Sequence, residues 1–319
     1  MRKILVPIAQ YESCIAALDL GGRLSKSLGA DLTILHTIAD LSGSHLGSGV
    51  ATGKLAEWGI DPPHFKVLQQ ARIRLQAQEL FQLDARGLPV ERHSLKALAQ
   101  GLYEIHLAGN KGQNVRFRLR EGSAARVILN EAEDPLYDLI ITGTRGHRGL
   151  KRLLSGSISQ EIALHAPCSH LVAKNLVSDQ GILVGVTGRD TSQEAVRQAG
   201  VLAEALGIPI VLLAVALDES GKALAQQHLQ EAAKLLRGKG VQLKSMLQMG
   251  EPSSVLLREA SKSQILTLGR VRRSAVKEIF LGDISLKILD RATGPVLITS
   301  FPRTAPEIEP ETAPPKTDL

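Results

Sequence analysis

Aromatic side chains are scarce in this sequence, and its excess of positive charge is small. Phe, Trp and Tyr make up 3% of the 319 residues, whereas proteins that bind single-stranded nucleic acid stack the bases on exposed rings. The 38 basic and 32 acidic residues leave a net charge of +6 that is spread along the chain, as on solvated helix faces. The composition therefore argues against nucleic acid as a partner.

Cysteine is almost absent as well. Cys14 and Cys168 are the two cysteines, and neither has a CxxC partner or a cluster of histidines nearby. This spacing argues against a disulfide framework and a zinc site. We expect two reduced structural thiols, with a redox switch as the alternative. His36 and His170 lie in strand-like runs, and we expect packed side chains rather than metal ligands.

Long hydrophobic runs are missing too. The longest, at 208–217, is about half of the roughly 20 residues that a membrane-spanning helix needs. The opening "MRKILVPIA" passes straight into a strand-like run, without the apolar segment of a secretory signal. We expect a cytoplasmic protein that does not enter the membrane. The 44% hydrophobic content is enough for two domains, each with a buried core.

The sequence does contain a regular alternation of strand-like and helix-like segments. Residues 3–9 and 31–38 are β-branched, apolar runs of strand length, and the segment between them has apolar residues at helical spacing. The alternation returns at 114–174, where a helix is expected to begin after Ser123 as its N-cap. This order predicts a parallel, doubly wound α/β sheet.

The pattern occurs twice. Residues 181–217 match the opening element for element, and 241–270 match 115–145. An internal duplication of this kind predicts two similar domains, at 1–177 and 178–301.

The copies differ by an insertion in the first one, at about 39–114. We expect two amphipathic helices in it, around 73–83 and 93–107. Its Gly-rich stretch at 47–55 is similar to a P-loop but lacks the required hydroxyl residue, because Leu55 stands there. The tail at 302–319 is rich in Pro, Glu and Thr, and we expect it to be disordered.

One stretch, "GTRGHRGLKRLLSGSIS" at 143–159, predicts a binding site. Gly143 ends a predicted strand, where a side chain would block the approach of a ligand, and Gly146 allows a tight turn. Gly156 and Ser157 precede a predicted helix, whose first N–H groups and positive dipole end suit a phosphate. The stretch therefore predicts a phosphorylated ligand, most simply a nucleotide.

The spacing Gly-x2-Gly-x9-Gly-Ser, together with the flanking strands, resembles the nucleotide-binding signature of the universal stress protein family. The resemblance covers both copies except the insertion and the tail. It implies two tandem Rossmann-like domains of the adenine nucleotide alpha-hydrolase-like type, with parallel five-stranded sheets that pack as an intramolecular pseudo-dimer. It also implies ATP, with or without Mg²⁺, as the ligand.

The resemblance assigns residues to this site. Those implied to contact ribose and phosphates are Gly143, Thr144, Gly146, Gly156, Ser157 and Ile158. Those implied to line the adenine side are Pro7, Ile8 and Thr37 or Ile38. Ala9 stands where the family commonly has an acidic residue that holds the nucleoside.

The second copy departs further from the family pattern. Gly269 and Gly282 remain, but Arg272 replaces the second glycine and Asp283 replaces the serine. A carboxylate at the start of a helix would repel phosphate, so we expect this copy not to bind ATP in the usual way.

Basic residues accompany both loops. In the first copy they could clamp phosphates or belong to a solvated surface; they are Arg145, His147, Arg148, Lys151 and Arg152. A similar run in the degenerate copy favours a solvated surface or an anionic partner; it comprises Arg270, Arg272, Arg273 and Lys277.

The leading hypothesis is a regulatory or stress-response sensor that binds an adenine nucleotide in its N-terminal domain. One alternative is a nucleotide-independent scaffold for an unknown protein partner. Another is a slow ATPase, although the motif supplies no obvious general base and no catalytic residue is assigned. The sequence leaves open whether two chains form a homodimer.

Overall fold

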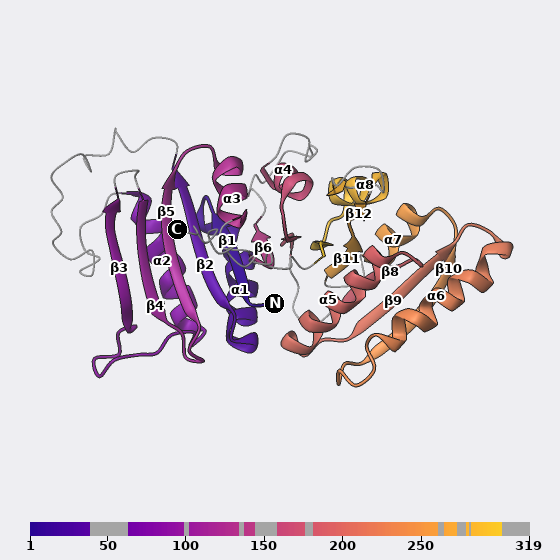
Figure 1. Ribbon diagram of the computed structural model, residues 1–319, viewed down its shortest axis with the longest axis horizontal. Coiled ribbons are helices and arrows are strands. Elements are labelled where there is room, and N and C mark those ends of the chain that lie inside the picture. The colour runs from indigo at the N-terminus through magenta and orange to yellow at the C-terminus, as the bar shows by residue number, and fades with distance from the viewer. Residues whose placement is uncertain are drawn as a thin grey trace, which may run out of the picture.

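The computed structural model describes residues 1–38, 63–98, 102–133, 137–143, 158–175, 181–260, 265–272, 279–280 and 282–301. Below, the first half denotes the described residues up to 175, and the second half those from 181. The two halves lie side by side and share one sheet, with β3 and β10 at its opposite ends (Figure 1). The strand order is β10-β9-β8-β11-β14-β7-β6-β1-β2-β5-β4-β3. The predicted α/β architecture is therefore confirmed.

The first half contains seven strands of the shared sheet. In chain order its elements are β1 (Lys3–Ile8), α1 (Tyr11–Leu28), β2 (Asp31–Ile38), α2 (Pro63–Ala77), β3 (Glu91–Leu98), β4 (Leu102–Ala108), β5 (Asn114–Glu121), α3 (Ala124–Glu133), β6 (Leu139–Thr142), α4 (Ile158–His165) and β7 (Ser169–Val172).

The second half repeats the order without the β3–β4 pair. Its elements are β8 (Ile182–Val186), α5 (Asp190–Leu206), β9 (Ile210–Ala216), the short 3-10 helix η1 (Glu219–Gly221), α6 (Lys222–Lys234), β10 (Leu243–Met249), α7 (Pro252–Ala260), β11 (Ile265–Gly269), β12 (Val271–Arg272), β13 (Ile279–Phe280), α8 (Asp283–Arg291) and β14 (Val296–Thr299). β12 and β13 pair outside the main sheet.

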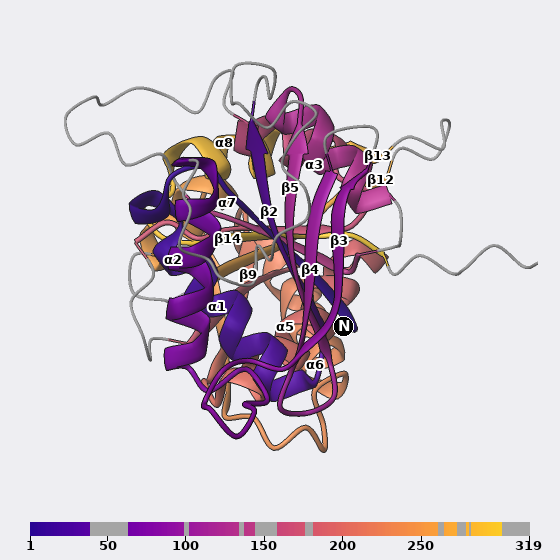
Figure 2. The same ribbon diagram turned by 90° about the vertical axis from the view of Figure 1, so that its left-hand side faces the viewer.

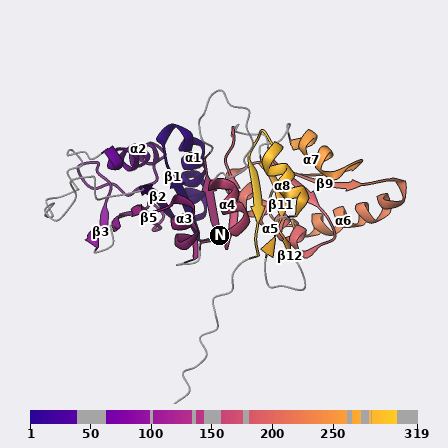
Figure 3. The same cartoon turned by 90° about the horizontal axis from the view of Figure 1, so that it is seen from above.

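Helices cover both faces of the sheet because successive side chains of a strand point to opposite faces. On β1, Ile4 and Val6 pack into the core under α1, whereas Leu5 packs with Ile128 of α3 and Ile162 of α4. Figure 3 shows α1 and α2 on one side of the first-half strands and α3 on the other. The parallel strands β1, β2 and β6 are buried on both faces, as expected for parallel sheets.

The duplicated sequence also repeats local detail. α1 is capped by Gly29 (φ 65°) and α5 by Gly207 (φ 68°), and both glycines have the left-handed conformation that glycine adopts without strain. None of the described helices is both long enough and apolar enough to cross a membrane.

The insertion differs from the sequence expectation. The first expected helix, around 73–83, is displaced: α2 begins at Pro63 and ends at Ala77, and residues 78–83 are not helical. The second, expected around 93–107, is wrong: these residues form the antiparallel strands β3 and β4, and β4 pairs with β5. Figure 2 shows β4 and β3 extending the sheet beyond β5. This half therefore has two more strands than the expected five.

A buried ionic network attaches this extension to the body of the first half. Arg118 of β5 donates to Glu104 of β4 (Nη2 to Oε1, 3.0 Å) and pairs with Glu131 of α3. Tyr137 Oη donates to Glu131 (2.9 Å) and lies 2.8 Å from Thr33 Oγ1 of β2, which can donate to it in turn. The two carboxylates are almost fully buried, so each needs a cation or hydrogen-bond donor.

The two halves meet along an antiparallel strand pair. β7 pairs with β14 in the register Val172↔Val296, Leu171↔Leu297 and His170↔Ile298. Both strands are buried, and α1 packs against α5 beside them. The expected intramolecular pseudo-dimer is confirmed.

Candidate functional site

The described residues of the predicted nucleotide site lie at one edge of the sheet. β1 lies between β2 and β6 and runs parallel to both. Their carboxyl ends therefore place Ile8, Ile38 and Gly143 at the same edge, where the strand order reverses. Ligands of doubly wound sheets bind at such a point.

The side chains at this edge divide into core and surface. Ile8 and Ile38 are 2% and 6% exposed and belong to the hydrophobic core. The Ile8 carbonyl lies 2.8 Å from His36 Nδ1, and the Ile38 carbonyl accepts from Gly122 N (2.8 Å). Pro7 is also buried, whereas Thr37 is half-buried and Ala9 is exposed. Among the five residues expected on the nucleoside side of the site, Thr37 and Ala9 are therefore the two that are accessible from outside.

Close packing explains why position 143 is a glycine, and the sequence alone did not show this. A Cβ atom at this position would lie 2.2 Å from Ser13 O and 2.9 Å from Cys14 Cα, both in the first turn of α1. The matching Gly269 would meet Thr191 O of α5 at the same 2.2 Å. The first glycine of the motif therefore lets a helix approach the strand end in both halves. Its presence alone does not require a ligand.

Most of the other residues that the resemblance assigns to the site are not among the described residues. Thr144, Gly146, Gly156 and Ser157 lie outside the described residues, as does the proposed basic clamp between 145 and 152. α4 begins at Ile158, directly after Ser157, where the motif predicts a helix start.

The second half keeps a pocket at the equivalent edge. It has a volume of about 180 Å³ and opens at the carboxyl ends of β8, β9 and β11 and the first turn of α8. Its lining is mainly apolar and includes Val186, Leu213, Val215, Leu256, Leu268 and Ile284. Asp283 is the first residue of α8 and places a carboxylate at the helix end where phosphate would bind.

Arg270 corrects the interpretation of the second basic run as solvated. Its side chain follows β11 at the position of Thr144 in the first copy, yet it is 3% exposed. The guanidinium crosses to the first half, where Nη1 donates to Ala166 O (2.6 Å) and Nη2 to Ala163 O (3.0 Å). Because burial removes water from the charge, the pKa of Arg270 falls to about 10, and the group remains a cation at neutral pH.

His36 and His170 are packed side chains, as the sequence predicts, and both cysteines are buried as well. His170 is fully buried, with Nε2 2.9 Å from Thr142 Oγ1. Burial, with a smaller contribution from the positive charge of Arg270, lowers the pKa of His170 to about 3. Cys14 and Cys168 are buried and form no disulfide. Among the described residues, no group of three His, Cys, Asp or Glu side chains could hold a metal ion.

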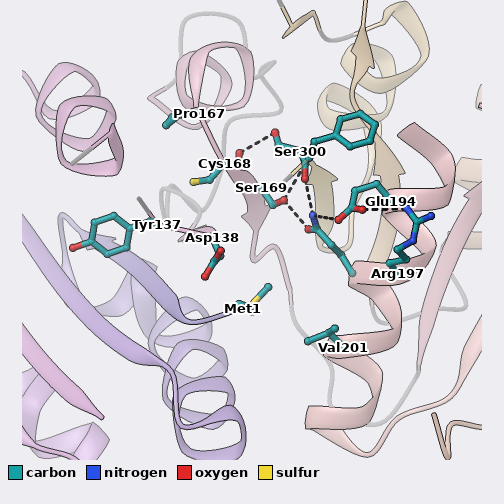
Figure 4. Close-up of a pocket in the computed structure, with 12 residues that line it drawn as sticks. Met1, Tyr137, Asp138, Pro167, Cys168, Ser169, Glu194, Arg197, Val201 and Ser300 are labelled. Carbon is teal, nitrogen blue, oxygen red and sulfur yellow. Dashed lines mark hydrogen bonds and ion pairs between the residues drawn. The ribbon is translucent and has the colours of Figure 1, made fainter. Parts of the chain in front are cut away.

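A second cavity, of about 230 Å³, lies between the halves at the opposite edge of the first-half strands. Figure 4 shows Ser169 and Ser300 facing the helix that carries Glu194 and Arg197. Ser169 Oγ donates to Gln198 Oε1 (2.7 Å) and accepts from Ser300 N (2.9 Å), and Gln198 Nε2 donates to Ser300 O (2.6 Å). Each of these groups has a hydrogen-bond partner in the others. The bonds therefore link β7 of the first half to α5 and to the end of β14 in the second half.

Comparison with known proteins identifies the family. The sequence model of the universal stress protein family matches residues 1–174 and again 180–300. This chain belongs to the universal stress protein family. A universal stress protein of Mycolicibacterium smegmatis is 26% identical over 233 residues, which cover 65% of this chain and 76% of that protein. YxiE of Bacillus subtilis, another universal stress protein, is 27% identical over 172 residues, covering 54% of this chain and 98% of its own length.

Solved structures agree on the fold. A universal stress protein from Archaeoglobus fulgidus superposes with a TM-score of 0.60 at 15% identity, covering 93% of this chain and 97% of that one. One from Pseudomonas aeruginosa gives 0.62 at 16% identity, with 94% and 93% covered. The paired arrangement of the two halves is thus shared with other members of the family.

Proposed function

We propose that this universal stress protein is a regulatory, stress-response sensor that binds an adenine nucleotide in an N-terminal domain, residues 1–177. The observation that carries the proposal is the asymmetry of the copies. The first has the complete Gly-x2-Gly-x9-Gly-Ser motif leading into α4, whereas α8 in the second, residues 178–301, starts with Asp283. The positive end of the α4 dipole favours a bound anion, whereas the positive end of the α8 dipole already has the Asp283 carboxylate beside it.

The geometry of the first half is compatible with such a ligand. Ala9 and Thr37 face outward at the sheet edge, and α4 presents its N-terminus one residue after Ser157. ATP, with or without Mg²⁺, is the proposed ligand.

Thermal unfolding with and without ATP tests the proposal. A ligand that binds only the folded state adds about 2.7 kcal/mol at a concentration 100 times its dissociation constant, which raises the melting temperature measurably. An unchanged melting temperature at millimolar ATP would instead favour a nucleotide-independent scaffold. Phosphate release at high protein concentration would reveal a slow ATPase.

The exposed Ala9 allows a sharper version of this test. An Ala9→Asp variant restores an acidic residue at the position where the resemblance implies nucleoside binding, and we expect it to tighten ATP and adenosine binding. Thr187→Asp is the matched variant, since Thr187 is the equivalent and also exposed residue of the second half. It should leave both affinities unchanged. Equal effects of the two variants would argue against a site specific to the first half.

A further inference from the structure

Two cations cross the junction, and each caps a helix of the opposite half. Arg270 of the second half donates to the Ala163 and Ala166 carbonyls at the end of α4, at 3.0 and 2.6 Å. Lys174 of the first half donates from Nζ to the Leu289 and Ala292 carbonyls at the end of α8, at 2.6 and 3.2 Å. Each half therefore holds the last turn of the other half's helix.

The acceptors are equivalent, but the donors are not. α4 and α8 are the helices that follow the motif in the two copies, and the carbonyls are those of matching residues in their last turns. Lys174 follows β7, at the end of the first half. Arg270 follows β11 and stands in the motif itself. A residue within the degenerate motif, at the position of Thr144 in the first copy, thus contacts the helix that follows the intact motif.

The environment of Arg270 indicates a strong and directional contact. Its side chain is buried, and among the described residues no carboxylate lies within ion-pair distance of it. The charge is compensated by carbonyl groups at the negative end of the α4 dipole. Because hydrogen bonds from charged groups are stronger than neutral ones, this contact fixes the C-terminal end of α4.

α4 depends on such an anchor because it is short. It has 8 residues, which corresponds to about 12 Å, and a helix of that length is not stable alone. Ile162 and Ala163 are its buried residues, and it packs on α3 and β7. A change in the direction of its axis would move its N-terminus, whose first N–H groups are the proposed donors to the phosphates.

We propose that Arg270 of the second half is a positioning residue for the nucleotide site of the first half, acting through α4. The inference rests on the proposed function and adds its regulation: the degenerate copy sets the nucleotide affinity of the intact copy. Any event that loosens the junction would weaken nucleotide binding, and bound nucleotide would in turn strengthen the junction, because such coupling is reciprocal.

The test compares two cationic caps that hold equivalent carbonyls on different helices. ATP affinity is measured by calorimetry for the wild type, Arg270→Met and Lys174→Met. We expect Arg270→Met to weaken ATP binding about tenfold, the change that follows from losing one charged hydrogen bond's contribution. Lys174→Met, which frees α8 instead, should stay within about twofold. Arg270→Lys, which can still reach one carbonyl, should recover part of the loss.

Hydrogen exchange provides a readout that needs no nucleotide. Arg270→Met should speed exchange of the α4 amides and leave α8 unchanged, whereas Lys174→Met should do the reverse. If Arg270→Met does not fold, the milder Arg270→Lys is used for both measurements.

The outcomes separate the two proposals. If the wild type binds no ATP, the proposed function fails and this inference fails with it. If the wild type binds ATP but Arg270→Met binds it equally well, or if both Met variants weaken binding alike, the positioning role alone is refuted.

Discussion

Replacing Gly143 by alanine tests why the first motif glycine is present. The added Cβ would lie 2.2 Å from Ser13 O and 2.9 Å from Cys14 Cα. These contacts are far shorter than van der Waals distance and involve backbone, which cannot rotate away. Overpacking a core costs about 1–3 kcal/mol and occasionally more, and we expect a cost near the upper end, about 3 kcal/mol. At two to four degrees per kcal/mol, the melting temperature should fall by roughly 6–12 °C.

The assay is urea and thermal unfolding of Gly143→Ala beside two companions. Gly269→Ala meets the same obstacle at Thr191 O, 2.2 Å away, and should lose as much stability although its half has no intact motif. Gly294→Ala is the control, because its Cβ would have no heavy atom within 4 Å, and it should be nearly neutral. Wild-type stability of Gly143→Ala with loss of ATP binding would refute the packing explanation and assign this glycine to the ligand.

Two further predictions concern buried charge. His170 has a pKa of about 3 when folded and about 6.5 when unfolded, so the unfolded state binds the extra proton between these values and stability falls as the pH falls. Urea unfolding should show that His170→Asn loses about 2 kcal/mol less than the wild type between pH 7 and pH 5; parallel curves would contradict a neutral His170. Arg118→Met removes the cation that Glu104 and Glu131 share, leaving Glu104 with His106 and Glu131 with Arg120, and should cost about 3 kcal/mol, the lower end of the range for breaking a buried ion pair. The matched Arg86→Met removes an exposed ion pair with Asp84 and should cost less than about 1 kcal/mol; similar losses would show that the buried network is unimportant.

The sequence predicted the parts of the fold that are locally encoded. Apolar runs such as 3–9 and 31–38 could be recognised as strands because they are buried on both faces and flanked by helix-periodic segments. The internal duplication then predicted the second half, and the family resemblance predicted that the two halves pack as a pseudo-dimer.

The hairpin of β3 and β4 shows where local patterns fail. Leu95, Leu98, Leu102 and Ile105 recur at near-helical spacing, but the pairing of β4 with the edge of β5 overrides that preference. Register shifts in the β3–β4 pair account for the departure from strict alternation.

The candidate site was predictable as a motif but not as a set of contacts. Nothing in the sequence indicates that Gly143 faces the first turn of α1, because those residues are far apart along the chain. Arg270 was similarly hidden: a basic residue in a loop is usually solvated, and its burial follows from the way β7 and β14 bring the halves together.

Calorimetric titration of ATP with Mg²⁺ tests the central claim most directly, when applied to the wild type, Gly156→Val and Gly282→Val. Gly282 precedes α8 with φ −68° and ψ 158°, an extended conformation that valine accepts, so this variant is the matched control in the second half. We predict one site per chain in the wild type and in Gly282→Val, and none in folded Gly156→Val. Two sites per chain, or a site lost in Gly282→Val and retained in Gly156→Val, would contradict an adenine-nucleotide site in the first half alone.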